Sequence, residues 1–172
     1  MGEFEGVTVS VEEGMEVATL RYFERECAFA ERVHAYSGLA LPQVREARYA
    51  PATDVALAWG SPTETLCLTR AAGRLCALAS ELAGCADGCL VTLSGGLKVV
   101  RLNGPRVTDL LHRLGGTGSV PALGEARRSR LADVAVLALS LRAGETLLVV
   151  DRAYLAHLMA WISETLLDFA AG

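Results

Sequence analysis

Three histidines and five cysteines are the residues of this chain best suited to acid–base, nucleophilic or metal chemistry. Nucleophilic catalysis needs a nucleophile, a base and an orienting group in mutual contact. The histidines are His34, His112 and His157; each falls in a segment of predicted helix, and none belongs to a recognisable catalytic motif. We therefore expect no catalytic residue in this chain.

The cysteines favour neither a disulfide framework nor a metal centre. Their odd number, together with an acidic start that lacks the basic lead of a signal peptide, argues against a set of disulfides. Only Cys85 and Cys89 have a spacing close to that of metal ligands, and no second pair or nearby histidine completes a set of four. We expect no metal site, and we expect Cys67 and Cys76 to be small core residues.

No segment carries the signature of a bound nucleotide or flavin. Ser94-Gly95-Gly96 lacks the further glycines or the Gly-Lys-Ser/Thr of a phosphate loop, and it is better interpreted as a hairpin turn. Tyr22, Phe23 and Phe29 could line a pterin pocket, although core packing is the simpler interpretation. We expect this chain to bind no cofactor itself.

Charge and hydropathy exclude two classes of partner. The 172 residues carry a net charge of −4 and have a pI near 5.4, which argues against nucleic acid. No apolar run approaches the roughly 20 residues that a membrane span needs, so we expect a cytoplasmic protein. The basic cluster of Arg127, Arg128 and Arg130 is expected to be a solvated face, with contact to an acidic partner as the alternative.

A pattern of two strands followed by a helix occurs three times. The first copy has strands at Val55–Trp59 and Thr65–Thr69, and the third has strands at Val134–Leu141 and Thr146–Val150. The second copy is Val91–Leu114, with a hairpin at Gly95-Gly96 and a helix after Asn103-Gly104-Pro105. There Gly104 is the expected N-cap and Pro105 the first helical residue. The three helices that follow the strand pairs are amphipathic. Their expected core positions are Leu75, Leu78, Ala79 and Leu82 in the first, Val107, Leu110, Leu111 and Leu114 in the second, and Leu155, Leu158, Ile162, Leu166 and Phe169 in the third. Asp151 is the expected N-cap of the third helix, and Trp161 is expected on its flank.

The remaining segments complete an α+β prediction. We expect residues 1–16 to be a flexible or weakly ordered N-terminus, with a short strand through the alternating Val7, Val9 and Val11 as the alternative. Residues 17–22 are expected to form a strand and 24–36 a helix. Residues 43–53 and 115–130 are expected to be exposed connections. The repeated strand–strand–helix units predict antiparallel sheets with helices packed on them, in ferredoxin-like halves. Residues 17–172 would form a single domain of two intertwined subdomains.

Several short motifs along the chain suggest a family through their order and spacing. They are Gly38-Leu39-Ala40-Leu41-Pro42, LAWGSPTETL at 57–66, Leu102-Asn103-Gly104-Pro105-Arg106, Leu131-Ala132-Asp133-Val134, and LLVVDRAY at 147–154 before a helix that contains Trp161. In this order they resemble the gamma subunit of heterotetrameric sarcosine oxidase, over residues 17–169. The wider relatives are the folate-binding domains of the glycine-cleavage T-protein and of a tRNA-modifying GTPase.

The resemblance implies a non-catalytic gamma subunit that packs between large flavoprotein subunits. In such a complex sarcosine is oxidatively demethylated to glycine with transfer of the one-carbon unit to tetrahydrofolate, and FAD, FMN, NAD and tetrahydrofolate lie in the partner subunits. An isolated chain is expected to form a homodimer. The alternative is a stand-alone folate-binding, aminomethyltransferase-like protein, for which Asp133, Glu145 and Asp151 are the nearest acidic candidates.

Overall fold

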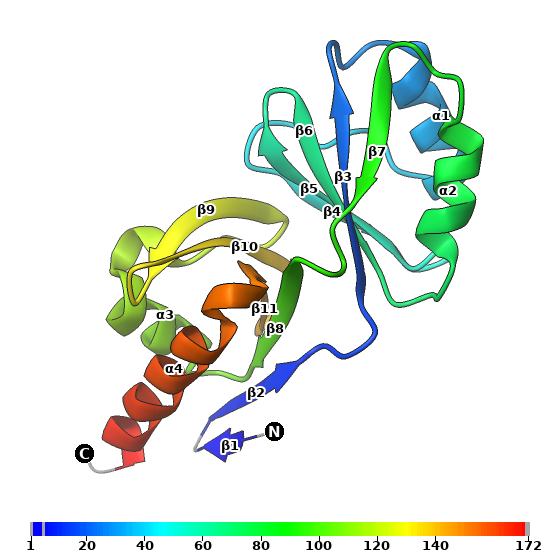
Figure 1. The fold of residues 1–172 in the computed structure, drawn as a ribbon. Coiled ribbons are helices and arrows are strands. Elements are labelled where there is room, and N and C mark those ends of the chain that lie inside the picture. Colours follow the sequence, from blue (N-terminus) through cyan, green and yellow to red (C-terminus); the bar gives the residue numbers. More distant parts are fainter. Residues whose placement is uncertain (1, 5, 171–172) are drawn as a thin grey trace. The chain divides into compact units, whose positions relative to one another are not determined.

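The computed structural model describes residues 2–4 and 6–170, and it has an α+β fold (Figure 1). The chain forms two compact units. The first unit takes both ends of the chain, Met1–Glu13 and Gly96–Gly172, and the second is Gly14–Gly95. The chain therefore starts one unit, builds the other, and then returns to complete the first.

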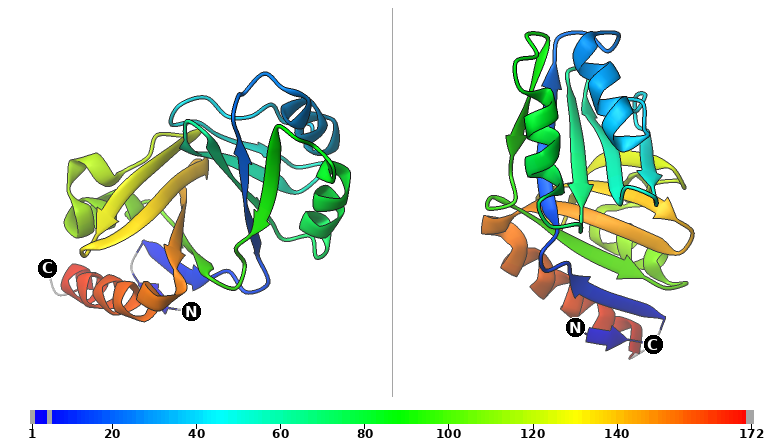
Figure 2. Two further views of the ribbon diagram at one scale, coloured as in Figure 1. Left: turned by 45° about the horizontal axis from the view of Figure 1, so that its top comes forward. Right: turned by 90° about the vertical axis from the view of Figure 1, so that its right-hand side faces the viewer.

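The second unit is a five-stranded antiparallel sheet with two helices. Its strand order is β4-β5-β6-β3-β7. The elements are β3 (Glu16–Tyr22), α1 (Ala28–Ser37), β4 (Ala47–Ala50), β5 (Val55–Ser61), β6 (Glu64–Thr69), α2 (Arg74–Leu82) and β7 (Gly88–Thr92). Both helices cover the same face of the sheet (Figure 2, right). The core between them contains Leu20, Phe29, Val33, Leu57, Cys67, Leu75 and Leu78, all buried.

The first unit is a six-stranded antiparallel sheet, also with two α-helices. Its strand order is β1-β2-β8-β11-β10-β9. The elements are β1 (Gly2–Phe4), β2 (Val7–Val11), β8 (Leu97–Asn103), α3 (Val107–Gly115), the 3₁₀ turn η1 (Thr117–Ser119), β9 (Glu125–Leu131), β10 (Val134–Arg142), β11 (Glu145–Asp151), η2 (Arg152–Tyr154) and α4 (Leu155–Ala170). Apolar residues at alternating strand positions pack in one core with apolar residues of α3 and α4. The strand residues include Val7, Val9, Val100, Leu102 and Leu148, and the helix residues include Leu110, Leu111, Leu158, Ile162 and Leu166.

Two of the three predicted strand–strand–helix units are confirmed. β5, β6 and α2 form the first, and β10, β11 and α4 form the third. Asp151 lies where a helix N-cap was expected, since its carboxylate accepts a hydrogen bond from the Ala153 N–H at 2.8 Å. Trp161 lies on the exposed flank of α4, as its helical phase predicts. The predicted first strand, 17–22, is β3.

The hairpin predicted at Gly95-Gly96 is wrong. β7 pairs with β3 in the second unit, whereas β8 pairs with β2 and β11 in the first. Neither Gly95 nor Gly96 has the positive φ that a two-residue hairpin turn requires. The two glycines instead stand at the point where the chain passes from one unit to the other. Apolar runs on either side of a Gly pair identify strands, but they do not identify which strands pair.

The N-terminal segment contains the strand that the alternating valines offered as an alternative. The prediction that residues 1–16 are weakly ordered is wrong for Val7–Val11, which form β2, pair with β8 and bury Val7 and Val9. Met1 and Glu5 lie outside the described residues, as do Ala171 and Gly172 at the other end of the predicted domain. The alternation of valines in β2 is the pattern of a half-buried strand.

The close approach of the N-terminal segment also moves the start of α3. Gly104 has a φ of +132°, and a Cβ at this position would overlap the carbonyl oxygen of Gly6. A glycine is therefore required at position 104 because any side chain would clash with the backbone of Gly6. Gly104 is not the N-cap of α3, so that prediction is wrong. Arg106 occupies the N-cap position, and its N–H donates to the Gly6 carbonyl at 3.1 Å.

Two predicted connections contain strands, and one predicted core residue is exposed. The segment 43–53 contains β4, and 115–130 contains most of β9; both are outer strands of their sheets. Cys67 is buried as predicted, but Cys76 is exposed on α2. The prediction for Cys76 is wrong because it lies one position from Leu75 and so points away from the core face.

Candidate functional site

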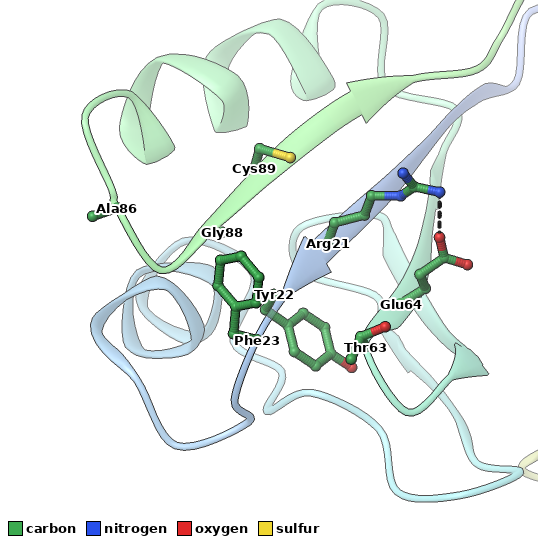
Figure 3. A pocket seen from close by; sticks show the side chains of 8 residues that line it. All are labelled: Arg21, Tyr22, Phe23, Thr63, Glu64, Ala86, Gly88 and Cys89. Carbon is green, nitrogen blue, oxygen red and sulfur yellow. Dashed lines mark ion pairs between the residues drawn. The ribbon is translucent and has the colours of Figure 1, made fainter.

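The candidate site is a surface pocket of about 610 Å³ in the second unit (Figure 3). It lies where β3 ends and where β6 and β7 begin. Eight residues line it, and they are Arg21, Tyr22, Phe23, Thr63, Glu64, Ala86, Gly88 and Cys89. The sequence predicts none of these as a site residue, and only Tyr22 and Phe23 are among the aromatic residues that could line a pterin pocket.

Strand register assembles the polar side of the pocket. Arg21 of β3 lies opposite Glu64 of β6 and opposite Cys89 of β7. The Arg21 guanidinium and the Glu64 carboxylate form an ion pair of 2.5 Å (Figure 3). Because residues opposite one another on neighbouring strands share a sheet face, the thiol of Cys89 belongs to the same row.

The aromatic side of the pocket comes from alternation at the end of β3. Tyr22 points into the core, where its hydroxyl lies 2.9 Å from the Thr65 hydroxyl. Phe23 is the next residue and is 84% exposed, beside the pocket opening. Phe29, the third candidate for a pterin pocket, is fully buried and tilted against the Tyr22 ring at 6.5 Å, so it is a core residue.

Gly88, at the edge of the pocket, lets β7 pack closely against β3 and the ring of Phe29. A Cβ at this position would stand 2.6 Å from the carbonyl oxygen of Arg21 and 2.7 Å from Cγ of Phe29. Any side chain here would therefore displace either the β3 backbone or a buried ring.

The chemistry of this pocket suits binding better than catalysis. An exposed aromatic ring, an ion pair and a thiol can hold a planar or apolar group. No histidine is among the lining residues, so the Cys89 thiol has no imidazole base beside it.

The structure does not gather the three histidines into one site. His34 lies on α1 in the second unit, and His112 and His157 lie on α3 and α4 in the first. Nε2 of His157 donates to the Ala132 carbonyl at 3.3 Å, and its ring meets the Trp161 ring edge-on at 6.5 Å.

A second pocket brings Cys27 and His34 near each other without pairing them. Both line a cavity of about 630 Å³. They are seven residues apart at the start and in the last turn of α1, and a helix rises about 1.5 Å per residue, so about 10 Å separates them along the axis. The Cys27 thiol donates instead to the Glu24 carbonyl at 3.1 Å. This geometry is not that of a nucleophile and its base.

The described residues contain no cluster of three or more His, Cys, Asp or Glu side chains arranged to hold a metal ion. Cys89 lines the first pocket, while Cys85 packs against the core of the second unit. The buried Cys67 is chemically quiet, since burial, and then the charge of Glu16, raise the pKa of its thiol to about 12.

The acidic candidates for folate binding have structural partners. Asp133 lies in the turn between β9 and β10 with a φ of +64°, near Arg130. Glu145 forms an ion pair with Arg101, and Asp151 accepts a hydrogen bond at the start of η2. Arg101 also binds the Glu12 carboxylate at 2.7 Å, so one guanidinium joins β8 to β11 and to the segment after β2.

The basic cluster lies on the outer strand β9. Arg127 pairs with Glu125 on the same strand at 3.1 Å, and Arg130 donates to the Asp133 carbonyl at 2.6 Å. Arg127 and Arg130 are thus bound locally, and β9 is a charged sheet edge of the kind that discourages further strand pairing.

Comparison with solved structures places the chain in a known fold class, the two-unit α+β fold of sarcosine oxidase and aminomethyltransferase chains. In the heterotetrameric sarcosine oxidase from Corynebacterium sp. U-96, in complex with pyrrole 2-carboxylate, a chain superposes with a TM-score of 0.85 and 21% identity. The match covers 99% of this chain and 89% of that chain. The resemblance seen in the sequence motifs is confirmed at the level of the fold.

Two further structures share the fold at lower similarity. The glycine cleavage system aminomethyltransferase T from Bartonella henselae matches with a TM-score of 0.68 and 12% identity, over 91% of this chain and 45% of that one. The regulatory subunit of aspartate kinase from Thermus thermophilus, in its ligand-free form, matches with a TM-score of 0.52 and 12% identity, over 92% and 97%. No protein-family model and no curated protein matches the sequence. At identities of 12–21%, these matches show that the chains share a fold.

No helix within residues 2–4 and 6–170 combines the length and the apolar character needed to cross a membrane.

Proposed function

We propose that this chain is a non-catalytic, gamma-type subunit of a cytoplasmic, heterotetrameric sarcosine oxidase-type complex. In this proposal the large subunits hold FAD, FMN, NAD and tetrahydrofolate, and they oxidise sarcosine or a related amine. The observation that carries the proposal is the extent of the structural match, 99% of this chain and 89% of a chain from such an oxidase. A shared domain embedded in a larger enzyme would leave much of that chain unmatched.

An exposed aromatic patch on the first unit supports a docking role. The α4 aromatic patch consists of Tyr154, the last residue of η2, and of His157 and Trp161 on α4, and these residues follow one another at steps of three and four. Tyr154 is 56% and Trp161 52% exposed. Large aromatic side chains of this kind dominate the energetics of protein interfaces, and a monomer gains nothing by exposing them together. We assign this patch to contact with a large flavoprotein subunit.

Affinity purification of the tagged chain from its own host tests the assignment. We expect the wild-type protein to retain stoichiometric flavin and sarcosine-dependent oxygen consumption in the eluate. Trp161→Ala should lose most of both, because an interfacial Trp contributes about 2 kcal/mol or more to binding. Leu123→Ala is the matched control, since Leu123 is a large exposed apolar residue of the same unit outside the patch. Equal retention by the two variants would remove the patch from the proposal.

The folate-binding alternative has one observation in its favour, the pocket beside Phe23 in a fold shared with an aminomethyltransferase. A folate-binding protein would show saturable quenching of Trp fluorescence on titration with a reduced folate, and Phe23→Ala would weaken it. An unchanged emission and melting temperature at saturating folate would eliminate this alternative.

A further inference from the structure

The outer strand β7 lacks the features that normally protect a sheet edge. It ends the strand order of its sheet (Figure 1), and Cys89, Val91 and Thr92 are exposed. Its sequence, GCLVT, contains no charged residue and no proline. Natural proteins usually place charges, prolines or bulges on such strands to prevent further pairing. Two other edge strands follow that rule more closely: β9 carries Glu and three Arg, and β4 has only four residues, one of them Arg48.

The ladder to β3 determines which backbone groups of β7 face outward. The Leu93 N–H donates to the Val17 carbonyl at 2.7 Å, and the Phe23 N–H donates to the Asp87 carbonyl at 3.3 Å. In an antiparallel pair, residues that exchange hydrogen bonds alternate with residues that do not. Cys89 and Val91 therefore direct their N–H and C=O groups toward β3. Gly88, Leu90 and Thr92 direct theirs away from the sheet, where the described residues place no strand.

We propose that β7 pairs antiparallel with β7 of a second copy of this chain, centred on Leu90. In this register Leu90 lies opposite its own counterpart, and Gly88 lies opposite Thr92 in both directions. The three residues whose polar backbone groups face outward are then the three that meet, and each pair exchanges two hydrogen bonds. The two five-stranded sheets become one continuous sheet.

Self-complementarity favours a second copy over a different partner. A twofold interface brings each patch onto itself, so a charge at its centre faces a like charge. β7 has none. The same register places Cys89 opposite Val91 of the other copy. It also brings Leu93 opposite Asp87 of the other copy, and Phe23, which has an exposed ring and directly follows β3, lies beside that Asp87. The pairing would thus cover apolar surface that the isolated chain leaves in water.

Disulfide trapping tests this register. Val91→Cys puts a thiol opposite the native Cys89 of the other copy, at a non-hydrogen-bonded position where Cα atoms stand about 4.5 Å apart, close enough for a disulfide. We expect mild oxidation to convert most of this variant into a covalent dimer. Thr92→Cys is the matched control: it is an exposed neighbour, but its residue faces Gly88, so no thiol is opposite. Equal cross-linking of both variants, or none of Val91→Cys, would overturn the proposal.

Light scattering provides a second measurement without a cross-link. We expect the isolated wild-type chain to be a dimer that dissociates on dilution. Thr92→Pro removes one outward N–H and leaves the ladder to β3 intact, so it should be a folded monomer with an unchanged circular dichroism spectrum. A wild-type chain that is monomeric at every concentration would overturn the proposal. That result would also be expected if β7 pairs with a strand of a different protein and not with a second copy of this chain. Because both measurements use the isolated chain, they stand or fall independently of the proposed oxidase partners.

Discussion

Replacing Arg101 should destabilise the first unit by breaking a nearly buried charge cluster. Its guanidinium lies between the carboxylates of Glu12 and Glu145, and the three side chains are only 19%, 14% and 11% exposed. Arg101→Met keeps most of the side-chain volume and leaves two acidic groups facing each other without their cation. Removing one partner of a buried ion pair costs about 3–5 kcal/mol. Because the three side chains keep some exposure to solvent, we expect Arg101→Met to lower the free energy of unfolding by a value near the lower end of this range, about 3 kcal/mol.

Chemical denaturation monitored by circular dichroism measures this loss. Arg130→Met is the matched control, because Arg130 and Asp133 are 68% and 100% exposed and 3.9 Å apart. Such a surface pair contributes about 0–1 kcal/mol. Adding Glu12→Gln to Arg101→Met should recover part of the stability, since it removes one of the two negative charges that Arg101 had separated. If Arg101→Met unfolds at the same denaturant concentration as Arg130→Met, the cluster does not hold β8, β11 and the N-terminal segment together.

Three further substitutions or titrations probe local features. Burial raises the pKa of Asp54, but hydrogen bonds from the Arg70 N–H and the Tyr49 hydroxyl outweigh it and hold the pKa below the ordinary value of 3.8. The stabilisation by the ionised Asp54 carboxylate is therefore fully present above pH 3.8, and it is lost as the pH falls through the lower pKa of the folded state. Asp54→Asn should lower the free energy of unfolding by about 1–2 kcal/mol at pH 7 and leave it unchanged in strong acid, as measured by urea titration. In the native protein a thiol reagent should label Cys89 and leave Cys67 unlabelled until denaturant is added; rapid native labelling of Cys67 would contradict its burial. Gly104→Ala should lower the free energy of unfolding by about 3 kcal/mol, because its Cβ meets a backbone carbonyl, and a neutral effect would show that β2 is not docked there.

Local periodicity predicted the elements whose side chains alternate between core and solvent. The helix α4 and the hairpin β10–β11 are confirmed because leucines and valines recur at the period of each structure. β9 was missed because its sequence, EARRSRL, has the composition of an exposed loop, and only its pairing with β10 makes it a strand. Gly95-Gly96 was misassigned because a pair of apolar strands does not reveal that the chain changes sheets between them.

The candidate pocket could not be predicted from the sequence. Arg21, Glu64 and Cys89 are far apart along the chain and come together only through the registers of β3 with β6 and β7. The available signal was the apolar residue Phe23 directly after a predicted strand, where alternation would direct it away from the core that holds Tyr22. A single sequence does not supply the strand order that completes the site.

The most direct test of the central claim is sarcosine turnover by the native assembly. The complex that purifies with the tagged chain should consume oxygen when sarcosine is added, with flavin bound to the larger subunits, while the isolated chain should show neither flavin nor activity. Isolation of the native chain free of any flavoprotein, or sarcosine oxidation by this chain alone, would contradict the assignment of an accessory subunit.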